Sequence, residues 1–100
     1  SYPVNGRWGV GTTTAKGPID CSGKRVISFS GDQRSDSNGG VSGLRNKTVQ
    51  QVGTSDYRVT DVFANGQVSN GRVSYTLSIK DNDHVVLSGQ TGTLKLQRCR

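Results

Sequence analysis

The sequence predicts an all-β fold, a small antiparallel meander barrel or sandwich of about seven strands, in one domain spanning residues 1–100. Residues that favour helices are scarce, since the chain contains no Glu, no Met, two Ala and five Leu. Twelve Val and nine Thr suit a pleated sheet, and fourteen Gly and twelve Ser suit its turns. Short alternating segments separated by turn signals are typical of such folds.

The positions of the only two cysteines predict one disulfide that closes the domain. Cys21 follows the first expected strand, and Cys99 is the next-to-last residue. A bridge between them would tie the last strand to the beginning of the fold and stabilise it by roughly 4 kcal/mol on an entropic estimate. Disulfides persist in oxidising compartments, so we expect a secreted or periplasmic protein.

The first half of the chain holds the less regular strands. Asn5–Thr14 alternates glycines with larger residues and is expected to be a strand with Trp8 on its packed face. Lys24–Ser30 is the second expected strand. Gly31–Gly43 is rich in Gly, Asp, Ser and Asn, which predicts a loop or hairpin tip. Thr48–Val52 is expected to be a short, weak strand.

The second half is more regular. In the clearest segment, Gly71–Lys80, apolar residues alternate strictly with polar ones, which indicates a half-buried antiparallel strand. Asn65-Gly66 is a hairpin signal that ends the segment before it. The four strands expected in this half are Tyr57–Phe63, Gly71–Lys80, His84–Ser88 and Thr93–Cys99.

Sequential hairpins favour a meander, in which the strand of Trp8 and the strand of Cys99 are neighbours at the closure. Leu94 and Leu96 are expected to face inward, and Cys99 then falls on the opposite face of its strand. A buried bridge therefore requires a bulge or a strand end near Arg98.

The inventory of reactive side chains predicts neither an enzyme nor a cofactor. The chain contains one His and no Glu, and no nucleophile-elbow motif is present. His84 beside Asp83 is the one pair around which a small enzyme could be built, and that alternative stays open. Two cysteines are too few for a zinc site of the cysteine type.

Calcium is the one realistic metal for this sequence, because it prefers oxygen ligands. Two clusters offer such ligands, namely Asp32, Asp36 and Asn38, and the run Asp81–Asp83. Neither has the spacing of an EF-hand, and the same residue types are ordinary turn formers. We therefore predict no metal site.

The charge points to an anionic partner. Thirteen basic residues against seven acidic ones give a net charge of +6. Four basic residues are expected on the outward faces of their strands, namely Arg58, Arg72, Lys80 and Lys95. They would form a basic stripe if those strands are adjacent. The polar loop Asp32–Gly43 is a further candidate, because long loops on rigid scaffolds often hold function. The predicted binding residues are Arg58, Arg72, Lys80, Lys95, Arg34, Asp32 and Asp36.

The aromatic residues do not form a nucleic-acid interface on this interpretation. Phe29, Tyr57, Phe63 and Tyr75 share strand faces with aliphatic residues, which places them in the core and not beside the basic residues. We therefore expect no nucleic-acid partner. The same apolar residues are expected to fill so small a barrel, although a pocket at its open end would make the protein a lipocalin-like carrier. No apolar run approaches the length of a transmembrane segment.

Four short motifs carry a resemblance: Gly6-Arg7-Trp8, Cys21, Ile27-Ser28-Phe29 and the ending Arg98-Cys99. Together they resemble small exported proteobacterial proteins with a G-x-W, a Cys, an I-x-F strand and a terminal R-C. The resemblance implies a location in the envelope or outside the cell and a lipocalin-like small barrel, with no activity. In broad design the chain is also similar to periplasmic inhibitors of lysozymes and proteases, although it holds none of their inhibitory motifs in full.

These observations predict a secreted or periplasmic, non-enzymatic binding protein, such as an effector or an envelope-associated factor. We expect its loops and an Arg-rich outer face to engage an anionic macromolecule, either a protein or a glycan. Two alternatives remain open: an inhibitor of a secreted hydrolase, and a small lipocalin-like ligand carrier.

Overall fold

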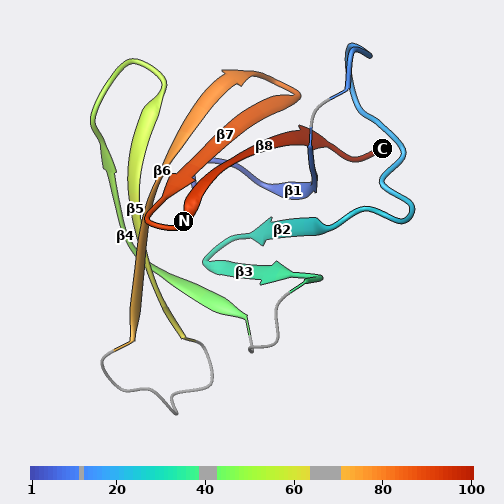
Figure 1. The fold of residues 1–100 in the computed structure, drawn as a ribbon. Helices are drawn as coiled ribbons and strands as arrows, with labels where there is room; N and C mark the ends of the chain where they lie inside the picture. Colours follow the sequence, from blue (N-terminus) through green and yellow to red (C-terminus); the bar gives the residue numbers. More distant parts are fainter. Residues whose placement is uncertain (12, 39–42, 64–70) are drawn as a thin grey trace.

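A computed structural model describes residues 1–11, 13–38, 43–63 and 71–100, and these residues form an antiparallel β-barrel without a helix (Figure 1). Each strand pairs with the next along the chain, and the first pairs with the last, which closes the barrel. The strands are β1 (Gly6–Val10), β2 (Val26–Ser30), β3 (Gln33–Asp36), β4 (Leu44–Gln51), β5 (Asp56–Phe63), β6 (Arg72–Asp81), β7 (His84–Gly89) and β8 (Gly92–Arg98).

The expected all-β meander barrel is confirmed, with eight strands in place of about seven. The additional strand is β3, which lies inside Gly31–Gly43 and corrects the expectation of a loop there. Its inward residue is Arg34, which pairs with Phe29 across the ladder, so no apolar alternation marks the strand. Residues 39–42 of the expected loop and the Asn65-Gly66 hairpin signal lie outside the described residues.

Strand β4 is longer than the short strand expected at Thr48–Val52. Its ladder with β5 runs from the Leu44–Phe63 pair onward, and the register shifts between Asn46 and Thr48. This shift breaks the period of two on which a strand is recognised in a sequence, because the inward and outward positions exchange at the bulge.

The core lies inside the barrel and follows the expected alternation. In β6 the inward residues Tyr75 and Leu77 are fully buried, and in β7 the same is true of Val85. The ring of Tyr2, from the segment before β1, packs edge-on against the ring of Phe29 with 4.9 Å between centroids. The other buried apolar residues of this cluster are Trp8, Ile27, Val59, Leu87 and Leu96.

The closure of the barrel is the β1–β8 ladder, in which Trp8 pairs with Arg98. The predicted disulfide is present there, between Cys21 and Cys99. Strand β8 ends at Arg98, as the opposite placement of Cys99 and the inward leucines required. Beyond that strand end, Cys99 forms a parallel bridge with Ile19.

Close packing under the disulfide makes Gly9 of β1 a sensitive position. A Cβ atom there would lie 2.8 Å from the Sγ atom of Cys21, a distance that real Cβ contacts do not show. We expect Gly9→Ala to lower the free energy of unfolding by about 1–3 kcal/mol through overpacking, as measured by denaturant titration. Gly89→Ala is the matched control, because its Cβ would meet Tyr75 Cβ at 3.6 Å and the Ser74 backbone oxygen at 3.9 Å, both ordinary contact distances. Equal losses in the two variants would contradict this explanation.

Gln97 of β8 is a fully buried amide that fastens a long connection to the barrel. Its Nε2 donates to the backbone oxygens of Ala15 and Gly17, at 2.9 Å each. Its Oε1 accepts from the backbone N–H of Thr13 at 3.0 Å. These bonds satisfy the buried amide, as burial of a polar group requires.

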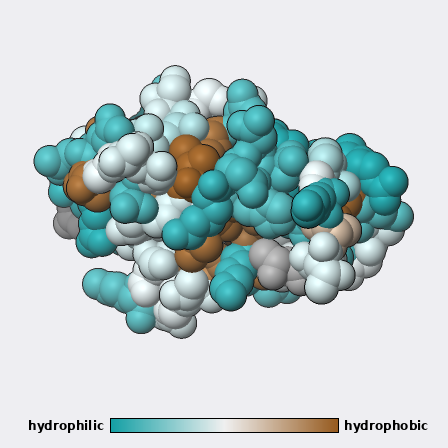
Figure 2. Space-filling view, turned by 90° about the horizontal axis from the view of Figure 1, so that it is seen from above, coloured by the Kyte–Doolittle hydropathy of each residue, from teal (hydrophilic) through white to brown (hydrophobic). Residues whose placement is uncertain are grey.

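The described surface is mostly polar. Hydrophilic and neutral residues cover most of the face seen in Figure 2, and hydrophobic ones show only in a few places. Among the described residues, Val52 is the one exposed large hydrophobic side chain. A helix able to cross a membrane does not occur in this part of the chain.

Candidate binding sites

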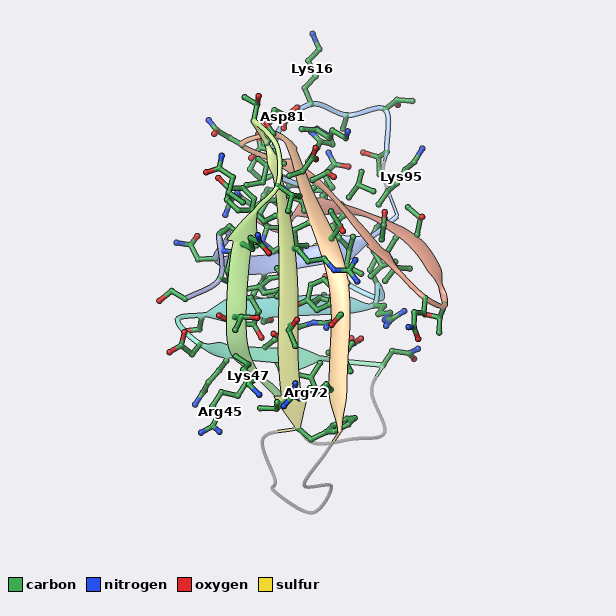
Figure 3. The ribbon with its side chains drawn as sticks, turned by 90° about the vertical axis from the view of Figure 1, so that its left-hand side faces the viewer. Lys16, Arg45, Lys47, Arg72, Asp81 and Lys95 are labelled. Carbon is green, nitrogen blue, oxygen red and sulfur yellow. A yellow bond between two sulfur atoms is a disulfide. The ribbon has the colours of Figure 1, made fainter. Side chains whose placement is uncertain are left out.

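The outer surface of β4, β5 and β6 gathers four exposed cations, which we call the basic face: Arg45, Lys47, Arg58 and Arg72. Val62 of β5 pairs with Arg45 on one side and with Arg72 on the other, so these two arginines lie in one row across three strands. Figure 3 shows Arg45, Lys47 and Arg72 toward the same end of these strands. Arg58 lies further along β5, opposite Thr76.

None of these four cations forms an ion pair with a described carboxylate. Within the described ranges, the one polar contact of the Arg58 side chain is a long one, from its Nη1 to the Thr76 hydroxyl at 3.5 Å. The neighbouring outward pair, Thr60 and Ser74, is joined by a hydroxyl–hydroxyl hydrogen bond of 3.1 Å. The basic face is therefore a polar sheet surface with positive charge that the described residues do not neutralise.

Only part of the stripe expected from the sequence is assembled. Arg58 and Arg72 lie on neighbouring strands, as the stripe requires. Lys80 is near the other end of β6, and Lys95 on β8 is separated from β6 by β7, where its partner is the uncharged Val86. In Figure 3, Lys95 is far from the end that holds Arg72. The β4 cations, which the sequence did not single out, complete the basic face instead.

The three candidate residues of the polar segment are each engaged within the fold. Asp32 pairs with the amino group of Ser1, at 2.8 Å. Asp36 accepts two hydrogen bonds from the guanidinium of Arg25, and this contact holds the pKa of the Asp36 carboxyl below its usual value. Arg34 points into the barrel, where only 9% of its side chain is exposed.

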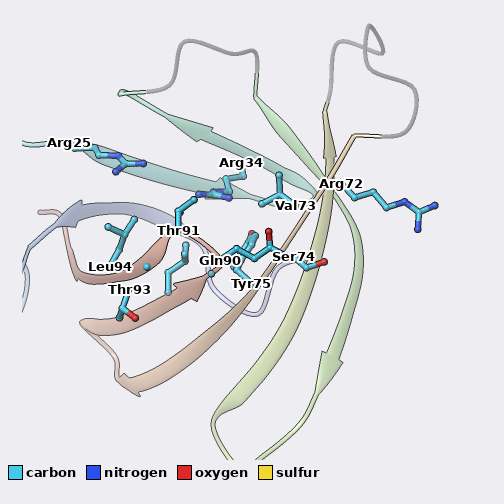
Figure 4. A pocket seen from close by; sticks show the side chains of 13 residues that line it. Arg25, Arg34, Arg72, Val73, Ser74, Tyr75, Gln90, Thr91, Thr93 and Leu94 are labelled. Atoms are coloured by element: carbon cyan, nitrogen blue, oxygen red, sulfur yellow. The ribbon is translucent and has the colours of Figure 1, made fainter.

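A pocket of about 630 Å³ opens at the end of the barrel that carries the β7–β8 turn (Figure 4). Apolar groups of Val73, Tyr75, Leu87 and Leu94 form part of its lining, and polar residues of the turn form another part. Arg34 of β3 and Tyr75 of β6 both line the pocket, as Figure 4 shows. The sequence predicts a barrel filled by its own side chains and leaves a pocket at the open end as an alternative, and the pocket lies at such an end.

Asp61 of β5 is fully buried beside the pocket and organises its floor. Its Oδ2 accepts a hydrogen bond of 2.6 Å from the Tyr75 hydroxyl, and its Oδ1 accepts one of 3.3 Å from Asn46 Nδ2. Burial, together with this carboxylate partner, raises the pKa of Tyr75. The phenol therefore stays a hydrogen-bond donor at physiological pH.

The cation of Arg34 is held in place by this floor. Its guanidinium carbon lies 4.9 Å from the centroid of the Tyr75 ring, and its Nη1 lies 3.7 Å from Asp61 Oδ2. The second distance is an ion-pair contact but is too long for a hydrogen bond. The buried Nε of Arg34 has no hydrogen-bond partner.

Among the described residues, no nucleophilic side chain forms a hydrogen bond with the ring of His84. Its Nδ1 lies 2.8 Å from Asp81 Oδ1 in an exposed turn, while Asp83 pairs with Arg98 at 3.6 Å. The backbone N–H of Asp83 and the His84 ring lower the pKa of Asp81. Over the described ranges, no group of three or more His, Cys, Asp or Glu residues is placed to hold a metal ion.

The chain matches no protein-family model, no curated protein and no solved structure.

Proposed function

We propose that this protein is a secreted or periplasmic, non-enzymatic binding protein whose basic face engages an anionic macromolecule. The observation that supports this function is the set of exposed cations without described ion pairs on the outer face of β4, β5 and β6. The disulfide is compatible with an oxidising compartment. The proposal agrees with the resemblance to small exported proteins that carry a terminal R-C.

An acidic glycan is the class of partner that suits this surface best. Arg45 and Arg72 flank Val62 from neighbouring strands, so their backbones are roughly 10 Å apart. Guanidinium groups form paired hydrogen bonds with carboxylate and similar oxyanions, and a repeating polyanion can occupy several of them at once. The hydroxyls of Thr60 and Ser74 lie on the same outer face and add neutral donors.

The surface offers little to nucleic-acid bases. Single-stranded binding depends on exposed aromatic side chains on which bases stack. Tyr2, Trp8, Phe29 and Tyr75 are buried, and the other two aromatic residues are half-buried. Contacts at the basic face would therefore be with the charged groups of a partner, and these weaken as salt rises.

We expect Arg58→Glu and Arg72→Glu each to reduce affinity for heparin, used as a probe polyanion, by about tenfold, because each reverses a charge on the basic face. Both side chains are exposed, so thermal unfolding should change little. The measurement is binding at several salt concentrations, with melting temperatures recorded in parallel.

Lys95→Glu is the matched control, since it makes the same charge change on an exposed strand position outside the basic face. An equal loss of affinity in Lys95→Glu would show that net charge alone governs binding, and it would overturn the assignment to β4–β6. A pull-down from envelope and secreted fractions at low and high salt would then identify the bound partner.

A further inference from the structure

The pocket at the β7–β8 end shares Arg72 with the basic face, and the other cations of that face do not line it. Arg72 contributes to the rim of the pocket, but its side chain points away from it, as Figure 4 shows. Arg25 also lines the pocket, and its charge is balanced by the paired hydrogen bonds to Asp36. Arg34 is therefore the cation of the pocket lining whose N–H donors are left for a ligand.

Asp61 accepts no hydrogen bond from the guanidinium of Arg34. Its two oxygens already accept from Tyr75 and Asn46, at 2.6 Å and 3.3 Å, and the nearest Arg34 nitrogen stays at 3.7 Å. Nε of Arg34 is buried and without a partner, and a buried donor left unsatisfied costs about 1–3 kcal/mol. A guanidinium presents five N–H donors in a planar fork, and none of them donates a hydrogen bond to Asp61.

The fork is also fixed before any ligand arrives. The Tyr75 ring lies under the guanidinium, and the Asp61 charge holds one side of it. Only 9% of the Arg34 side chain is exposed, so its rotamers are already restricted by the surrounding barrel. Ordering of the side chain therefore costs little on binding, which favours affinity.

We propose that this pocket binds a small organic carboxylate, whose anionic group is held by the fork of Arg34 and whose apolar body contacts the Val73, Leu87 and Leu94 wall. A volume of about 630 Å³ is within the range of small-molecule sites. A carboxylate matches the guanidinium with two parallel N–H···O bonds. The mixture of an apolar wall and one sheltered cation suits a molecule that is apolar at one end and anionic at the other.

The test compares 2-naphthoate with its neutral analogue 2-naphthamide by titration calorimetry on the whole chain. The amide has similar shape but replaces one acceptor oxygen by a donor nitrogen, which the fork of Arg34 cannot receive. We expect the dissociation constant of the naphthoate to be at least about tenfold lower than that of the naphthamide, because charge-assisted bonds are the stronger ones. Backbone amide shifts in NMR spectra should fall on the Gly89–Gly92 turn and on the start of β6.

Arg34→Gln is expected to abolish the preference for the naphthoate. The variant Arg34→Gln/Asp61→Asn does the same without leaving an unpaired buried carboxylate, so a folded protein remains available for the comparison. Lys80→Gln loses one positive charge at an exposed residue outside the pocket and should keep the preference. Equal affinities for the two probes, no binding of the naphthoate, shifts on other elements, or a preference that survives in the Arg34 variants would each overturn the proposal. Because the heparin experiment uses other residues, either proposal can fail alone.

Discussion

Replacement of both cysteines by serine is expected to lower the free energy of unfolding by about 4.5 kcal/mol, which corresponds to a fall in melting temperature of about 20 °C or more. The bridge joins Cys21 to Cys99 across a sequence separation of 78 residues, so its removal releases a large loop in the unfolded chain. A domain of this size has a total stability of about 5–15 kcal/mol. The loss is therefore a large share of what keeps the barrel folded.

The same pair replaced by alanine separates the cross-link from the new hydroxyl groups. Because Cys21 is buried, a serine there also carries a polar group into an apolar site. If loss of the cross-link dominates, the free energies of unfolding of the two double variants will differ by no more than about 1–2 kcal/mol. These variants are Cys21→Ala/Cys99→Ala and Cys21→Ser/Cys99→Ser. A double variant as stable as the parent in urea titration would show that the bridge contributes little.

Removal of the Arg34 charge is the second change with a large expected effect. Arg34→Gln should lower the free energy of unfolding by about 3–5 kcal/mol, because it leaves Asp61 fully buried without its cation. Urea titration at pH 7 measures the loss. Arg72→Gln, at an exposed position, should change the stability by less than about 0.5 kcal/mol.

The double variant Arg34→Gln/Asp61→Asn tests whether the loss comes from the unpaired carboxylate. The amide that replaces the Asp61 carboxylate would be neutral, and its oxygen could still accept the hydrogen bond from Tyr75, so most of the stability should return. If the two substitutions are simply additive, the ion pair at 3.7 Å is not the cause of the loss.

The sequence predicted the strands that alternate apolar and polar residues, and it missed those whose inward residues are polar. Gly71–Lys80 was predicted almost to the residue, because every second side chain enters the core. Strand β3 was missed because Arg34, its inward residue, is charged, and a charged residue between turn formers indicates a loop. The pairing of β3 with β2 makes this segment a strand, and that pairing is a property of the fold that local residue types do not reveal.

The same limit applies to the candidate sites. The sequence placed Arg58 and Arg72 on the outward faces of their strands, but whether those strands are neighbours followed only from the β5–β6 ladder, and the β4 cations joined them only through the β4–β5 register. Asp61 lies two residues before Phe63, which the sequence places in the core, yet nothing local signalled its contact with Arg34. A charged residue at an inward position of a strand is the one sequence signal that would have pointed to the pocket, because charged residues are seldom buried without a partner.

The topology of the closure also bears on how the chain folds. Seven of the eight ladders join consecutive strands, so each of them closes a shorter loop than the ladder between the first and last strands. The β1–β8 ladder instead joins residues as far apart as Trp8 and Arg98, and its formation closes the longest loop among the ladders. Because the Cys21–Cys99 bond lies at this same seam, a chain that has been oxidised once keeps the two edges near each other. After any later opening, the barrel can reclose as a local event and no longer as a long-range search.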